Sequence, residues 1–239
     1  MNLFRRALPL LLLASFSTPS LALEPFVANY RIFANGKPMG EATMQVVHGD
    51  TPGRWRMDLD MRGTRGLVGL ANVNAQQSTV FDTLGETYRP LSQSTVRKAV
   101  FLGKQITGTY DWNTRTARWT GDVKKKRQVP VPLQDGDMSG LLINLAIIRD
   151  AQPGKTLHYR FVDNGRARDH QYTVSPELEG VEVDGMGFNA MKVSRVQGSG
   201  NDETVLWVVD GVPTPVRVLQ RDNGEDTYDL RLVDYKGAQ

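Results

Sequence analysis

The sequence contains no cysteine and only three histidines among its 239 residues. The absence of cysteine excludes a disulfide framework, a thiolate metal site, a cysteine nucleophile and a lipid-modified cysteine. Three histidines leave little room for a histidine-rich metal cluster, so no metal site is expected. These absences narrow the chemistry open to the chain, but the sequence alone identifies neither a reaction nor a ligand.

The chain also lacks a large net charge of either sign. The formal net charge is +3, from 29 basic and 26 acidic residues. Two of the basic residues, Arg5 and Arg6, lie in a segment that we expect to be removed, which leaves a net charge of +1. This balance excludes a general nucleic-acid-binding protein. Hydrophobic residues make up 40% of the chain, enough for a sizeable core rather than a disordered chain.

No apolar run has the roughly 20 residues that a helix needs to cross a bilayer, so we expect no membrane-spanning segment. Residues 1–22 instead resemble a secretory signal peptide. Two arginines precede the apolar run Ala7–Phe16, and a small-x-small cleavage site ends at Ala22. An uncleaved N-terminal anchor is the alternative.

We expect cleavage near Ala22 and a single β-rich domain over residues 23–239, located in the periplasm or secreted. ATP and nicotinamide pools are cytosolic, so no cofactor is expected.

Alternation of polar and apolar residues predicts strands along most of this domain. Residues 56–62 and 228–232 alternate without a break, which places one strand face on a core and the other in water. Asn-Gly pairs such as Asn35-Gly36 favour hairpin turns with positive φ at both residues. Strands are expected at residues 25–34, 39–48, 54–62, 74–82, 90–100, 104–112, 115–121, 125–131, 156–163, 167–176, 187–196, 203–210, 214–221 and 226–235. Short turns between them predict an antiparallel meander.

One apolar segment interrupts the strands. Residues 140–149 are apolar on nearly every side, which predicts a helix that is covered on most of its surface. Asp137 is the expected N-cap of this helix, and Ser139 is the weaker alternative. The predicted fold is therefore mainly β, a single curved antiparallel sheet or an open or half barrel, with one central apolar helix in its concave face.

Several short motifs occur along the chain in a set order. They are Tyr30, Asn35-Gly36, Gly40, the helix approach Pro132–Ser139, Tyr172-Thr173-Val174, Gly187–Lys192, Leu206-Trp207 and Pro215-Val216-Arg217. In this order they resemble a family of exported proteobacterial proteins known only as a domain of unknown function. The helix approach departs from the family pattern, because Gln134-Asp135-Gly136-Asp137 stands where the family has Gly-x-Gln-Asp.

The resemblance implies an exported, β-rich protein and supplies no catalytic residues. The implied architecture is similar to that of the half-barrels that carry lipids or lipoproteins across the periplasm.

The expected ligand-binding residues are apolar. They are Leu67, Val68 and Leu70 in a glycine-broken loop, and Met138, Leu141, Leu142 and Leu145 at the helix. The loop is expected either to cover an apolar cavity or touch a membrane, or simply to pack on the core. The basic run Lys124–Arg127 could contact lipid phosphates or an acidic partner, but is more typical of a solvated strand edge.

The histidines do not predict a shared site. In an ideal hairpin around Asn164-Gly165, His158 faces Gln171, so His158 and His170 point to opposite faces of the sheet. Asp137 and Ser139 fit helix capping better than an acid beside a nucleophile. The favoured function is non-enzymatic binding of an apolar or amphipathic ligand, such as a lipid, an acyl chain or a lipoprotein. A scaffold that binds an envelope protein is the alternative, and a periplasmic hydrolase is less favoured.

Overall fold

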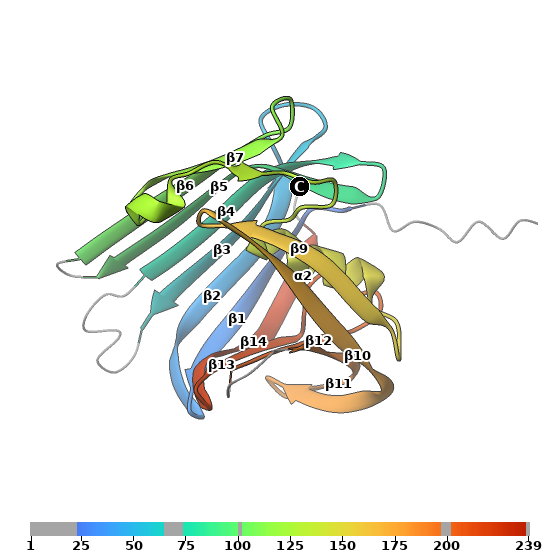
Figure 1. The fold of residues 1–239 in the computed structure, drawn as a ribbon. Coiled ribbons are helices and arrows are strands. Elements are labelled where there is room, and N and C mark those ends of the chain that lie inside the picture. The colour runs from blue at the N-terminus through green and yellow to red at the C-terminus, as the bar shows by residue number, and fades with distance from the viewer. Residues whose placement is uncertain (1–22, 65–73, 100–101, 197–201, 238–239) are drawn as a thin grey trace, which may run out of the picture.

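The computed structural model describes residues 23–64, 74–99, 102–196 and 202–237. These ranges form one antiparallel sheet of 14 strands (Figure 1). The strands are β1 (Phe26–Ala34), β2 (Lys37–His48), β3 (Arg54–Gly63), β4 (Asn74–Leu84), β5 (Thr87–Ala99), β6 (Leu102–Asp111), β7 (Thr116–Gly121), β8 (Val131–Pro132), β9 (Thr156–Asp163), β10 (Arg166–Val183), β11 (Met186–Val196), β12 (Glu203–Val208), β13 (Arg217–Asp222) and β14 (Glu225–Gly237). A 3₁₀ helix, η1 (Lys125–Arg127), and one α-helix, α2 (Gly140–Asp150), lie between β7 and β9.

The strand order follows from the short turns. Each strand pairs with its neighbours in sequence, except that β8 and β9 do not pair and form the two edges of the sheet. Strand β1 also pairs with β14 and joins the two halves of the chain. The sheet therefore runs from β8 back to β1, and then from β14 back to β9. Both residues of the Asn35-Gly36, Asn164-Gly165 and Asn223-Gly224 turns have positive φ, as predicted. The predicted fold class is confirmed.

Two predicted strands differ from those observed. Residues 125–127 form η1 rather than part of a strand, and β8 is a single pair of residues at 131–132. Strand β10 continues seven residues beyond its predicted end, to Val183. Its pairing with β11 shifts between Val174 and Leu178, so the residues between them, which include Pro176, bulge out and hide the continuation of the strand.

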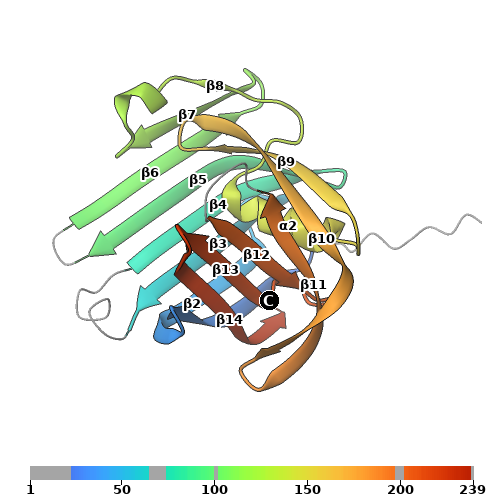
Figure 2. The same cartoon turned by 60° about the horizontal axis from the view of Figure 1, so that its bottom comes forward.

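Helix α2 lies inside the curve of the sheet, between β9 on one side and β3 to β5 on the other (Figures 1 and 2). Six of its eleven residues are buried, on more than one side of the helix: Leu141, Leu142, Ile143, Leu145, Ala146 and Ile147. They join the inward residues of β1 to β3 and of β10 to β14 in one hydrophobic cluster. Hydrophobic burial on this scale explains why the helix is apolar nearly all round.

The two edges of the sheet are brought together by the segment that precedes α2. Met138 forms an isolated parallel bridge with Phe161, with its amide bonded to the Arg160 carbonyl at 3.0 Å. Asp137 adds an ion pair with Arg160, whose Nη1 lies 2.6 Å from a carboxylate oxygen. A second, smaller core around Tyr110, Trp119 and Val162 packs in the same region. The sheet is thereby nearly closed into a barrel.

No helix within the described ranges is long and apolar enough to span a membrane.

Candidate ligand cavity

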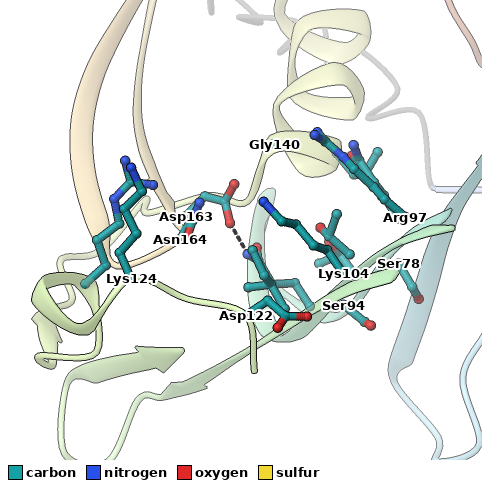
Figure 3. Close-up of a pocket in the computed structure, with 16 residues that line it drawn as sticks. Ser78, Ser94, Arg97, Lys104, Asp122, Lys124, Gly140, Asp163 and Asn164 are labelled. Atoms are coloured by element: carbon teal, nitrogen blue, oxygen red, sulfur yellow. Dashed lines mark hydrogen bonds between the residues drawn. The ribbon is translucent and has the colours of Figure 1, made fainter. Parts of the chain in front are cut away.

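A cavity of about 330 Å³ lies on the concave side of the sheet, next to the N-terminal end of α2 (Figure 3). Residues of β4, β5 and β6 form one wall, and Gly140 and Leu141 of the helix form another. The segment 122–127 and the turn between β9 and β10 complete the lining. Most of the lining side chains are polar or charged, and Ile106 and Leu141 are the aliphatic ones.

Strand alternation explains the polar floor of this cavity. Thr79 pairs with Gln93, and Gln77 pairs with Thr95, so these four side chains share the inward face of β4 and β5. Thr79 and Gln93 are buried although both are polar. Further along the same strands the inward face carries Phe81 and other core residues, so the chemistry of the floor changes from apolar to polar toward the cavity.

Hydrogen bonds across the hollow tie this floor to β9. The Tyr110 hydroxyl lies 2.6 Å from Gln93 Oε1 and 2.7 Å from the Val162 carbonyl oxygen. The Gln93 amide group donates to the carboxylate of Asp163. Burial raises the pKa of the Asp163 carboxyl above its usual value, and the Gln93 hydrogen bond opposes that rise. These contacts fix Asp163 at the edge of the cavity and occupy one of its oxygens.

Four cationic side chains line the cavity from two directions. Arg97 and Lys104 extend from β5 and β6 toward the helix end that carries Gly140 (Figure 3). Lys124 and Arg127 lie on the opposite side, next to the turn at Asn164. Among the described residues, none of these four forms an ion pair, and Nε of Arg127 is buried without a hydrogen-bond partner.

The position of η1 depends on a close backbone contact. A Cβ atom on Gly165 would lie 2.0 Å from the backbone oxygen of Arg127, so only glycine fits there. Gly165 also has a φ of +67°, a conformation that favours glycine. The Asn164-Gly165 turn thus both closes the β9–β10 hairpin and supports the segment that carries Lys124 and Arg127. Of the basic run, Lys124 and Arg127 line the cavity, whereas Lys125 and Lys126 do not line it and are exposed.

The start of α2 differs from the predicted cap. Ser139 occupies the N-cap position, but its hydroxyl lies 3.0 Å from Thr79 Oγ1 and caps no backbone amide. The prediction that Asp137 caps the helix is wrong. Its carboxylate accepts from the Gln134 amide at 2.8 Å and pairs with Arg160, so it organises the turn before the helix instead.

The absence of a cap leaves donors at this end of the helix. In the described part of the chain, the backbone amides of Gly140, Leu141 and Leu142 have no acceptor. Such amides, together with the aligned peptide dipoles, give a helix N-terminus a partial positive charge. The cavity is therefore bordered by positive charge on the helix side as well.

The predicted ligand-binding residues at the helix have different surroundings. Leu141 lines the cavity, whereas Met138, Leu142 and Leu145 are buried in the hydrophobic cluster. Leu67, Val68 and Leu70 lie outside the described residues. Arg97 and Lys104 were not among the residues expected from the sequence. The alternation of polar and apolar residues could have indicated both, because it places Arg97 and Lys104 on the inward faces of their strands.

The histidines are separated, as the hairpin register predicted. His158 pairs with Gln171 and is exposed, and His48 is exposed and packs against Trp55. His170 is buried, stacks on Phe161 and lies 3.0 Å from an Arg195 nitrogen through Nε2. Burial and then the charge of Arg195 lower the pKa of His170 to about 4.

A hydrolase site would need a hydroxyl or carboxyl beside a basic group. In the described ranges, no histidine is hydrogen-bonded to a serine or to a carboxylate. The same ranges contain no cluster of three or more potential metal ligands.

Comparison with solved structures confirms the architecture. A β-barrel-like protein of the domain of unknown function DUF1849 from Brucella abortus superimposes with a TM-score of 0.52 at 9% identity, covering 91% of this chain and 99% of that protein. A DUF1089 family protein from Pseudomonas aeruginosa gives a TM-score of 0.36 at 10% identity, with 72% and 86% coverage. At such identities the first likeness shows the fold alone, and the second carries no argument.

No curated protein matches the sequence. A family model does match, over residues 29–231, which covers all but the ends of the described sheet. The chain therefore belongs to the family described as protein of unknown function DUF3108.

Proposed function

We propose that this chain is an exported, non-enzymatic binding protein of the periplasm that holds an amphipathic ligand in the cavity beside α2. The observation that carries the proposal is the cavity itself, which remains between the helix and the concave face of the sheet. Had the helix filled the hollow completely, the structure would leave no internal volume for a ligand. At about 330 Å³, the volume is at the lower end of the range of ligand pockets, about 300–1,000 Å³.

The lining favours an amphipathic ligand over a purely apolar one. Ile106 and Leu141 provide aliphatic surface, and each Å² of apolar ligand surface buried there contributes about 25 cal/mol. Four cationic side chains border the same volume, of which Arg97, Lys104 and Lys124 are exposed, and an uncharged hydrocarbon would make no electrostatic contact with them. A ligand with one apolar and one acidic part fits both features.

The proposed location rests on the sequence. Residues 1–22 have the charged, apolar and small-residue regions of a signal peptide, and the rest of the chain has no cysteine to receive a lipid anchor. Binding without catalysis agrees with the surroundings of the histidines and of Ser139 described above.

Native mass spectrometry tests this function directly. The protein would be purified from the bacterial periplasm and measured before and after extraction with organic solvent. We expect an added mass before extraction that disappears afterwards. Finding the unliganded mass in both samples would contradict the proposal, and a co-purifying protein in place of a small molecule would favour an envelope scaffold.

Two variants on one strand give the matched control. Ile106→Trp would fill the cavity, whereas Thr107→Trp adds the same ring to the opposite face of β6. The added mass should be lost in the first variant and kept in the second. Retention of the ligand in both would place it elsewhere on the protein.

A further inference from the structure

We propose that the cavity binds the phosphate group of a phosphomonoester, held between the cations of the sheet and those of the η1 segment. The inference rests on the proposed function, because it names the acidic part of the amphipathic ligand. Its basis is a set of charges that the described structure leaves without partners.

The lining of the cavity has an excess of positive charge. Four cations and two carboxylates, Asp122 and Asp163, line the cavity, which is an excess of two positive charges. Both carboxylates already accept hydrogen bonds, Asp122 from the Gln105 amide and Asp163 from Gln93. A phosphomonoester carries about −1.5 to −2 charges at pH 7 and offers three acceptor oxygens. A carboxylate or a phosphodiester carries one negative charge and would neutralise only half of the excess.

Two of the cations lie side by side on the sheet. Arg97 and Lys104 are directly opposite each other on β5 and β6. Alternation places both on the same inward face as Thr95 and Ile106, which line the cavity as well. Two like charges directly across a strand pair destabilise a sheet. An anion bound by both side chains would remove this repulsion. The pair of Arg97 and Lys104 is therefore explained as the part of an anion-binding site that the sheet supplies.

The other two cations lie on the opposite wall of the cavity. Lys124 and Arg127 lie on a segment whose position is fixed by Gly165, and they face the cavity while Lys125 and Lys126 between them do not line it. Arginine elsewhere in the described chain is often paired, as in Arg89 with Asp82 and Arg217 with Asp229. Arg127 lines the cavity and forms no ion pair in the described chain, so its guanidinium supplies donors suited to a phosphate oxygen.

The start of α2 adds to a site that these cations already define. The free amides of residues 140–142 lie at the end of an eleven-residue helix that borders the cavity. Backbone amides at a helix N-terminus are common phosphate ligands. A phosphate in the cavity would thus meet positive charge from the sheet, from η1 and from the helix.

Isothermal titration calorimetry with three probes tests the inference on the purified protein. The probes are inorganic phosphate, dihexanoyl phosphatidic acid and dihexanoyl phosphatidylcholine, of which the two lipids share the same tails. We expect phosphatidic acid to bind at least about tenfold more tightly than phosphatidylcholine, with an affinity that falls as salt is raised. Inorganic phosphate should bind more weakly than phosphatidic acid and compete with it.

The basic segment provides variants with a matched charge change. Lys124→Gln with Arg127→Gln removes two charges that line the cavity, and Lys125→Gln with Lys126→Gln removes two charges of the same segment that do not line it. The first pair should weaken phosphatidic acid by about tenfold or more, and the second by less than about twofold. Equal losses would show a general attraction to basic surface and overturn the phosphate site.

A second double variant guards against misfolding. Arg97→Gln with Lys104→Gln should also lose about tenfold in affinity, yet without ligand its melting temperature should be no lower than that of the unmodified chain. Unchanged affinity in this variant would overturn the inference.

The probes separate the two proposals. If both lipids bind equally and independently of Lys124 and Arg127, the amphipathic function stands and the phosphate inference fails. If inorganic phosphate binds and neither lipid does, the phosphate site stands and the amphipathic function fails. If no probe binds, both fail.

Discussion

The ion pair that joins the two edges of the sheet should account for a measurable part of the stability of the fold. Asp137 has a fully buried side chain, with both carboxylate oxygens within 2.7 Å of Arg160 Nη1. Asp137→Asn keeps the shape of the side chain but leaves Arg160, 22% exposed, without its partner. Breaking a fully buried pair costs about 3–5 kcal/mol. Because water reaches Arg160, we expect Asp137→Asn to lower the free energy of unfolding by about 2–3 kcal/mol and the melting temperature by about 5–10 °C.

Asp135 offers a control two residues away. It pairs with Arg115 at 3.1 Å, but the two side chains are 82% and 60% exposed. Asp135→Asn makes the same chemical change and should cost less than about 0.5 kcal/mol. Urea unfolding followed by circular dichroism measures both variants. Similar losses in the two variants, or a loss below about 1 kcal/mol for Asp137→Asn, would refute the role given to the buried pair.

Three further predictions concern the core and its response to acid. The pKa of His170 is about 4 in the folded protein, below its ordinary 6.5, so the unfolded chain takes up the proton first as the pH falls. The free energy of unfolding should therefore be highest above pH 6.5 and should decrease as the pH falls toward 4, by at most about 3 kcal/mol. Urea unfolding against pH should show that His170→Gln weakens this dependence while His158→Gln, at an exposed position, does not. Gly108→Ala should destabilise the protein by about 1–3 kcal/mol, because a Cβ there would lie 2.6 Å from Trp119 Nε1. The Cβ of Gly103→Ala would meet nothing closer than 3.9 Å, so this control should show the smaller loss in thermal unfolding. Leu142→Ala, in the centre of the helix contact, should cost about 2–5 kcal/mol by the same assay, and a loss below about 1 kcal/mol would contradict tight packing of α2.

Much of the fold could be predicted because its strands are joined by short turns. Asn-Gly pairs and alternation placed most of the strands, and the order of a meander follows directly from consecutive hairpins. The long strand β10 was cut short in the prediction because Pro176 and its neighbours resemble a strand end, although they form a bulge. The pairing of β1 with β14 joins residues about 200 positions apart and leaves no local signal.

The candidate site was less predictable for a physical reason. Apolar residues at the helix suggested an apolar cavity, but burial against the sheet already accounts for Met138, Leu142 and Leu145. The charges at the cavity come from three segments, and only the register of β5 and β6 shows that Arg97 faces Lys104. Cap residues were misassigned because Asp137 has a stronger partner, Arg160, on a strand that follows the helix in sequence.

The location of a bound phosphate headgroup is the most direct test of the account. Amide chemical shifts of the ¹⁵N-labelled protein would be followed by NMR during titration with dihexanoyl phosphatidic acid. If the cavity binds the phosphate, the largest changes should occur at the amides of Gly140 and Leu141, which have no acceptor in the described structure, and at the side-chain amide of Gln93 beneath the cavity. Changes confined to exposed apolar positions such as Leu178 and Met186, with Gly140 and Leu141 unmoved, would contradict it.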